Sequence, residues 1–252
     1  MERVDDTGFG GLKVIQKKGS GYGVDAVLLA AFAAGDTGAR GLAGTDGRTL
    51  RIADLGTGCG VAAFILFHKL GGARITGYDI NDEVIGRADR ACVINGVADR
   101  IDFVCCDVKD IDACGGFDAV ISNPPYFRRT PDEPGARDPG ERYIARHETT
   151  ADIADFAAAS ARMLDDGGHL YMVHRPDRLA DIITGMRAAG IEPKELQLVV
   201  PKPGRAANIA LIHGIKGAGP ELRMLPQIAV HTEDGGYSDE ILRYYERVSS
   251  LE

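Results

Sequence analysis

From residue 50 onward, short apolar segments alternate with longer segments that have the apolar spacing of amphipathic helices. Segment 117–122 is nearly all apolar, as expected for a strand buried on both faces of a sheet. Within 82–95, one helical face carries Val84, Ile85, Ala88, Ala91, Cys92 and Val93. Strands that alternate with helices favour parallel pairing, so the chain is predicted to form a doubly wound α/β sheet.

Seven strands are predicted for the sheet, besides one possible short strand at 12–16. They lie at 50–55, 74–78, 101–106, 117–122, 169–173, 196–200 and 207–213, with helices at 61–70, 82–95, 151–164, 178–189 and 238–248. The last two strands are joined by a turn at 201–204 without a helix, so one antiparallel edge strand is expected. A mostly parallel sheet with one reversed strand is the layout of the Rossmann-like, seven-stranded S-adenosylmethionine-dependent methyltransferase fold.

The chain has 252 residues, of which 44% are hydrophobic, and this suits a single structural domain. Residues 1–48 are predicted to form an N-terminal extension, and residues 49–252 the methyltransferase domain. Asp25 is the predicted N-cap of a helix over 25–35 that packs on the core, and Gly35 is its predicted end.

Composition excludes several classes of protein. Five cysteines without a C-x-x-C pair predict neither a disulfide framework nor a zinc site, so no metal is expected. No apolar stretch is long enough to span a bilayer, and no secretory signal precedes the domain. A cytoplasmic protein without a membrane partner is therefore expected, and a monomer is compatible with the sequence. The net charge of −8 argues against a uniformly basic surface, although local basic faces remain compatible with it.

A glycine-rich loop follows the first core strand and opens a helix. It reads Asp54-Leu55-Gly56-Thr57-Gly58-Cys59-Gly60. Ligands of doubly wound sheets bind beyond the carboxyl ends of strands, where glycines let the backbone approach closely. A dinucleotide loop would need glycine at position 61, which is valine, and phosphates gain nothing from Asp54. The loop favours S-adenosylmethionine, whose ammonium an acidic residue binds directly or through water; a plain tight turn is the alternative.

Two further carboxylates end successive strands. Asp79 is suited to the ribose hydroxyls of a nucleoside, and Asp107 to an adenine amino group. The structural alternatives are a helix N-cap for Asp79 and ordinary turn chemistry for Asp107. The glycine loop follows the first core strand, and these two carboxylates end the second and the third. A shared cofactor site is therefore the favoured interpretation.

The fourth strand ends in Ile121-Ser122-Asn123-Pro124-Pro125-Tyr126-Phe127. Proline fixes φ and holds the preceding residue extended, so this segment is a stiff arm that presents the Asn123 side-chain oxygen and the Pro124 carbonyl. Two such acceptors orient a planar NH₂ group and stabilise the positive charge that develops as its nitrogen takes a methyl group. Tyr126, with Phe127, offers a stacking surface. A rigid turn without function is the alternative.

Together these motifs resemble the amino-methyltransferases with an N-P-P-Y signature, and more closely the bacterial tRNA(Val) adenine-N6 methyltransferase family. The resemblance spans nearly the whole chain, with local matches at 21–29, 54–60, 123–127, 145–148, 173–176 and 201–204. Val24 departs from the family, in which a hydroxyl residue often precedes the equivalent aspartate. The roles of His147, His174 and Arg175 stay open, with structural anchoring as the simpler interpretation of both histidines.

The resemblance implies a catalytic segment and a cofactor site. The catalytic residues are Asn123, Pro124, Pro125 and Tyr126, and the cofactor residues are Asp54, Gly56, Gly58, Gly60, Asp79, Asp107 and Asn123. With tRNA as substrate, contacts are expected from Phe127, Arg128, Arg129, Arg146, Lys202 and Arg205. The expected reaction is methylation of adenine N6 in an anticodon loop. The alternatives are methylation of a protein glutamine or of ribosomal RNA, and a noncatalytic RNA-binding protein on the same fold.

Overall fold

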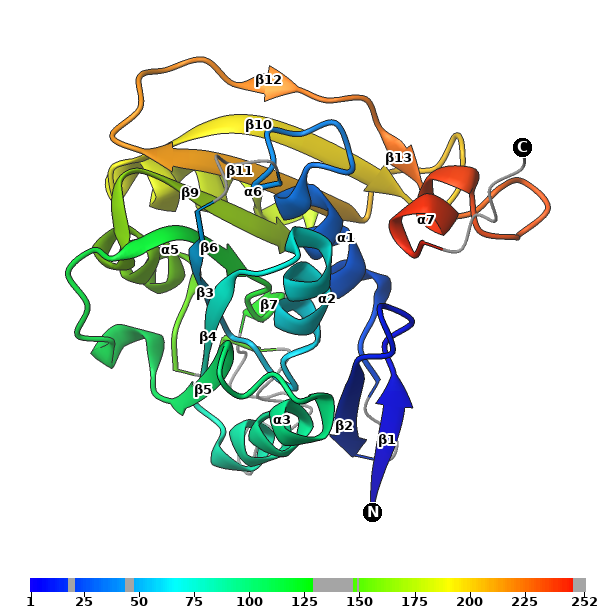
Figure 1. Ribbon diagram of the computed structural model, residues 1–252. Coiled ribbons are helices and arrows are strands. Elements are labelled where there is room, and N and C mark those ends of the chain that lie inside the picture. The colour runs from blue at the N-terminus through cyan, green and yellow to red at the C-terminus, as the bar shows by residue number, and fades with distance from the viewer. Residues whose placement is uncertain (18–20, 44–47, 129–146, 149, 247–252) are drawn as a thin grey trace.

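The computed structural model describes residues 1–17, 21–43, 48–128, 147–148 and 150–246. At its centre lies a sheet with helices on both faces (Figure 1). Its strands, in spatial order, are β12 (Arg223–Met224), β10 (Ile191–Val200), β11 (Ile209–Lys216), β9 (Leu164–His174), β6 (Phe117–Ser122), β3 (Arg51–Leu55), β4 (Arg74–Asp79) and β5 (Ile101–Cys105). The short β13 (Ile228–Ala229) also pairs with β10.

The strand order reverses between β3 and β6, because β4 and β5 lie on one side of β3 and all later strands of this sheet lie on the other. Every pairing from β5 to β9 is parallel. The predicted fold class is confirmed, with one correction: the reversed strand β11 lies between β9 and β10, antiparallel to both, and is not an edge strand. Six consecutive residues of β11 are buried, whereas three half-buried residues interrupt the buried residues of β10, so β11 suits the inner position.

Two groups of helices cover the sheet. One hydrophobic cluster contains α1 (Val24–Ala34), α2 (Val61–Leu70), α3 (Asp82–Asn95) and the short α7 (Asp239–Tyr244), and the other contains α5 (Ile153–Met163) and α6 (Leu179–Ala188). Helix α3 has the predicted bounds: the Asn81 side chain accepts a hydrogen bond from the Val84 amide, and Gly96, at φ 65°, ends the helix. None of the helices in the described part of the chain has the length and apolarity needed to span a bilayer.

The N-terminal residues form an antiparallel hairpin of β1 (Glu2–Asp6) and β2 (Lys13–Lys17), which lies beside α3 (Figure 1). Strand β1 was not predicted. The backbone of Lys13 makes two hydrogen bonds of 2.8 Å with the Asn95 side chain at the end of α3. The hairpin therefore supports the chain that leads to α1 at the rim of the sheet.

Helix α1 begins one residue earlier than predicted. Its N-cap is Gly23, and Asp25 lies inside the first turn without capping the helix, which corrects the assignment of Asp25 as the N-cap. The physical reason is tertiary, since the Asp25 carboxylate accepts a hydrogen bond from Tyr126. Smaller elements complete the chain: η1 (Val108–Asp110), β7 (Phe127–Arg128), β8 (His147–Glu148) and η2 (Pro176–Arg178).

Candidate cofactor and substrate site

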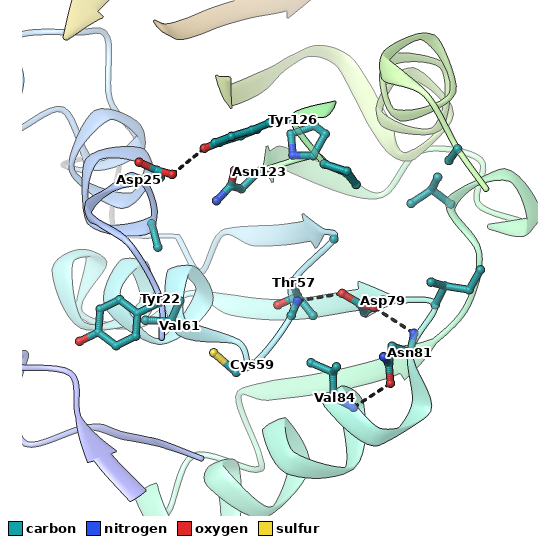
Figure 2. Close-up of a pocket in the computed structure, with 18 of the residues that line it drawn as sticks. Tyr22, Asp25, Thr57, Cys59, Val61, Asp79, Asn81, Val84, Asn123 and Tyr126 are labelled. Carbon is teal, nitrogen blue, oxygen red and sulfur yellow. Dashed lines mark hydrogen bonds between the residues drawn. The ribbon is translucent and has the colours of Figure 1, made fainter. Parts of the chain in front are cut away.

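A cavity of about 660 Å³ opens at the carboxyl ends of β3, β4, β5 and β6, where the strand order reverses (Figure 2). Its walls come from residues that follow these four strands, and from the chain between β2 and α1. In Figure 2, Asn123 and Tyr126 lie across the cavity from Asp79 and Asn81. This is the position at which ligands bind in open α/β sheets.

The glycine loop (residues 54–60) forms the floor through two of its three glycines. Gly56 and Gly58 have φ of +72° and +55° and line the cavity. A Cβ at Gly58 would meet no atom within 4 Å, so this part of the backbone faces open space that a ligand can approach. Among the described residues, Gly60 is not part of the lining. It is the N-cap of α2 at φ +77°, where a Cβ would overlap the ring of Phe103.

Asp54 lies behind the loop. Its side chain is 1% exposed, is absent from the described cavity lining, and accepts a hydrogen bond of 2.7 Å from the Thr57 hydroxyl. Burial raises the pKa of the Asp54 carboxyl to about 7, with the nearby Asp79 adding to the rise and the Thr57 hydrogen bond opposing it. In this arrangement Asp54 holds the loop, and its contact with a cofactor ammonium stays a prediction.

Asp79 and Asp107 both line the cavity, as their positions at strand ends led us to expect. Asp79 accepts hydrogen bonds from the amides of Gly58 (3.0 Å) and Asn81 (2.9 Å), so it joins the glycine loop to α3. Asn81 is the N-cap of α3, which excludes the structural alternative for Asp79. Asp107 accepts from the Lys109 amide (3.0 Å), so the turn chemistry is present. An ionised carboxylate has about four acceptor sites, so accepting from backbone amides is compatible with binding a ligand.

The diproline arm (residues 123–126) leaves β6 and lines the same cavity over its whole length. The Tyr126 hydroxyl donates a hydrogen bond of 2.8 Å to the carboxylate of Asp25, which lies 101 residues earlier in the chain (Figure 2). Burial and the neighbouring Asp25 raise the pKa of Tyr126 well above its usual 10, while a hydrogen bond with Asn123 opposes the rise. Burial also raises the pKa of Asp25. The tyrosine is therefore a protonated donor at neutral pH.

A buried histidine supports the arm from the other end. His174 ends β9, and its Nε2 donates to the Pro125 carbonyl at 3.3 Å while its ring centroid lies 5.0 Å from that of Tyr126. Burial lowers the pKa of His174 to about 4, so the ring is neutral at physiological pH. The anchoring role that the sequence left open is the one that this geometry supports.

The predicted RNA-contact residues lie in different settings. Phe127 lines the cavity, is 41% exposed, and has the Arg175 guanidinium 5.3 Å from its ring centroid. Lys202 and Arg205 lie in the turn between β10 and β11, remote in sequence from the diproline arm. Arg129, Arg146 and the side chain of Arg128 lie outside what the structure describes. Their contact with RNA stays a prediction.

Sequence reasoning missed several residues that line the cavity, among them Asp25 and Tyr22. Asp25 was assigned only to helix capping, and Tyr22, which also lines the cavity, was given no role. Both lie in the segment 21–29 that carried part of the family resemblance, which was the available signal. The contact of Asp25 with Tyr126 depends on α1 lying beside the diproline arm, which is not visible in local sequence.

Comparison with known proteins agrees with this geometry. The family described as a methyltransferase domain matches residues 52–136, which run from β3 through the diproline arm. This match includes the glycine loop, Asp79, Asp107 and the diproline arm, and covers about a third of the chain. A tRNA1(Val) (adenine(37)-N6)-methyltransferase of Aeromonas salmonicida is 28% identical over 88% of this chain and 86% of that protein. A protein of the same name from Porphyromonas gingivalis is 31% identical over 64% of this chain, and the match spans 60% of that protein. The predicted resemblance is confirmed.

Solved structures of methyltransferases share the fold. A predicted O-methyltransferase from Agrobacterium tumefaciens has a TM-score of 0.68 at 24% identity, covering 89% of this chain and 97% of that one. Geranyl diphosphate C-methyltransferase from Streptomyces coelicolor, solved with S-adenosyl-L-homocysteine, has a TM-score of 0.53 at 13% identity, covering 75% and 80% of the two chains. At these identities the comparison confirms the methyltransferase fold and carries no information on substrate.

Proposed function

We propose that this methyltransferase transfers a methyl group from S-adenosylmethionine to N6 of an adenine in a tRNA anticodon loop. One observation carries the proposal: the diproline arm and the glycine loop line one cavity, together with Asp79 and Asp107. The diproline arm, which can accept hydrogen bonds from an NH₂ group, thus shares a cavity with two carboxylates that suit a nucleoside. The names of the relatives from Aeromonas and Porphyromonas support the choice of nucleic acid and of base.

The chain's residues fit the proposed cofactor. Gly58 leaves backbone open to a ligand, as a close approach requires, and Gly56 also lines the cavity. Asp79 suits the ribose hydroxyls and Asp107 the adenine amino group, because a carboxylate accepts hydrogen bonds from both kinds of donor. Among the described lining residues, the carboxylates Asp25, Asp79 and Asp107 outnumber the basic Lys17 and Arg87, which suits a cationic ligand better than a phosphate. When bound, S-adenosylmethionine supplies an electrophilic methyl group.

The diproline arm acts on the target nitrogen. The lone pair of an exocyclic amine is delocalised into its ring, so the nitrogen is a poor nucleophile until its geometry is fixed. The Asn123 side-chain oxygen and the Pro124 carbonyl accept hydrogen bonds from its two N–H groups and stabilise the charge that develops. The Pro125 carbonyl is engaged by His174, which leaves the Pro124 carbonyl for the substrate. Tyr126, tethered by Asp25, provides the stacking surface.

The substrate arrives as RNA in this proposal. A base must leave its stack before its amino group reaches the arm, and an adenine in a loop does so at lower cost than one in a duplex. Phe127 at the rim offers a stacking contact, and Arg128, Arg129, Arg146, Lys202 and Arg205 offer phosphate contacts. A tRNA substrate places the protein in the cytoplasm.

The test uses labelled S-adenosylmethionine with total tRNA, ribosomal RNA and a release factor offered separately, followed by nucleoside mass analysis. We expect label in tRNA as N6-methyladenosine. Label only in protein would identify a glutamine amide as the acceptor. Label only in ribosomal RNA would make ribosomal RNA the substrate in place of tRNA. No methyl transfer to any of the three acceptors would contradict the proposed activity.

A variant tests the role of the arm. Asn123→Ala is expected to keep its affinity for S-adenosylmethionine in calorimetry and to lose at least 10²-fold in turnover, the usual cost of removing one preorganised hydrogen-bonding group. Full turnover in the variant would show that the Asn123 side chain does not hold the amine. Loss of cofactor affinity instead would assign the residue to the cofactor.

A further inference from the structure

A second cavity lies beside the first, with Tyr126 and Asp25 lining both. It has a volume of about 400 Å³, and its other walls come from Val24, residues 175–177 at the end of β9, and residues 207–209 at the start of β11. These segments are distant in sequence, and neither the cofactor site nor the amine site uses them. Tyr126 and Asp25 thus form a partition between two hollows.

The lining of the second cavity suits a flat heterocycle. Val24, Pro176, Ala207 and Ile209 give it apolar walls, while Asp25 and Asn208 add an acceptor and an amide at the edges. Nucleobases need this combination, since their faces are apolar and their edges carry donors and acceptors. The volume exceeds that of one base and falls below that of the first cavity.

The two cavities are joined at the rim by a stacked pair. Phe127 lines the first cavity and Arg175 lines the second, and the guanidinium carbon lies 5.3 Å from the phenyl centroid. Phe127 is 41% exposed, so the pair is accessible to a ligand that passes from one cavity to the other. Aromatic rings and arginine planes are the surfaces on which unstacked RNA bases rest, and arginine also contacts phosphate.

We propose that the second cavity holds the base of a nucleotide next to the target adenosine. The inference rests on the proposed function and adds a substrate contact to it. With the target base on the Asn123 side of Tyr126, its chain neighbour enters the space beyond the partition, and the linking backbone crosses the Phe127–Arg175 pair. The enzyme would thereby read a loop that presents two unstacked bases, and a lone adenosine would be a poor substrate.

The experiment combines a cavity-filling variant with an abasic substrate. Ala207→Phe puts a phenyl ring into the second cavity. Its matched control is Ala206→Phe, because Ala206 is exposed and is not part of the described lining. The substrate is the RNA stem-loop that carries the methylated adenosine, prepared intact and with an abasic nucleotide on either side of that adenosine. The readout is kcat/KM, measured with the RNA far below KM, with cofactor affinity and thermal unfolding as checks of the fold.

On the intact stem-loop we expect Ala207→Phe to lower kcat/KM about 10-fold. The wild type should use one of the two abasic substrates about 10-fold less well than the intact RNA, and on that substrate the variant should differ little from the wild type. Ala206→Phe should match the wild type. The inference would be overturned if Ala207→Phe lost kcat/KM equally on intact and abasic RNA, or lost none. It would also be overturned, without any variant, if the wild type used both abasic substrates as well as the intact RNA. If the wild type methylates no RNA, the proposed function fails, and the inference fails with it.

Discussion

The buried carboxyl of Asp54 permits a direct test of how the glycine loop is held. Its environment raises its pKa to about 7 from a usual value of 3.8, chiefly through burial. Asp54→Asn keeps the size of the side chain, and the amide oxygen still accepts the hydrogen bond from the Thr57 hydroxyl. The substitution therefore removes the titration and leaves the contact.

The sign of the effect follows from proton binding. Between pH 4 and pH 7 the folded protein retains the Asp54 proton while the unfolded chain has lost it, so folding binds a proton and stability falls as pH rises. One pKa unit corresponds to about 1.4 kcal/mol, and linkage with these two pKa values makes the wild type about 2 to 3 kcal/mol less stable at pH 8 than at pH 5. The asparagine variant lacks this contribution.

The assay is urea unfolding of both proteins from pH 5 to pH 8, with the exposed Asp112→Asn as a control for the loss of one carboxylate. Taking the difference between wild type and Asp54→Asn cancels the titration of all other groups. We expect the variant to gain about 2 to 3 kcal/mol relative to the wild type across this range. A difference that does not change with pH would refute the reasoning, and so would a variant that loses stability relative to the wild type as pH rises.

Three further predictions concern other residues in and near the site. Tyr126→Phe removes a hydrogen bond to the Asp25 carboxylate and should lower the free energy of unfolding by about 1 to 3 kcal/mol in urea at pH 8; an unchanged unfolding midpoint would contradict that role. In β4, Gly77→Ala places a Cβ against the Phe103 ring and should cost about 1 to 3 kcal/mol by the same measurement, whereas a neutral result would mean that the ring moves aside. Burial raises the pKa of the Cys59 thiol to about 11, so iodoacetamide at pH 8 should label the exposed cysteines first, as mass spectrometry can follow; labelling at equal rates would show that the thiol is open to solvent.

Much of the candidate site was predictable because it follows strand ends. A parallel sheet brings the carboxyl ends of its strands to one edge, so residues placed after consecutive strands meet there whatever the details of packing. Asp79, Asp107 and Asn123 were predicted on this basis, and all three line the same cavity. The bounds of α3 were also predictable, since the Asn81 cap and Gly96 act within a single turn of chain.

Other features required contacts across the fold. The partner of Tyr126 is 101 residues away, and without it Asp25 is indistinguishable from a capping residue. Either strand of the β10–β11 hairpin could in principle pair with β9. The hairpin sequence does not decide between them, and in the structure β11 is the strand beside β9. Asp54 heads a loop that does line the cavity, yet its own side chain points into the protein.

The sequence by itself determined the alternating strand and helix pattern, the glycine loop and the stiff diproline arm, because these depend on periodicity and on the backbone limits of glycine and proline, which act over a few residues. Only the tertiary structure decided which side chains hold that arm, which carboxylates meet solvent and where a second cavity opens. Those outcomes depend on burial and on hydrogen bonds between segments far apart in the chain, and their energies arise only when the layers of the fold are packed together.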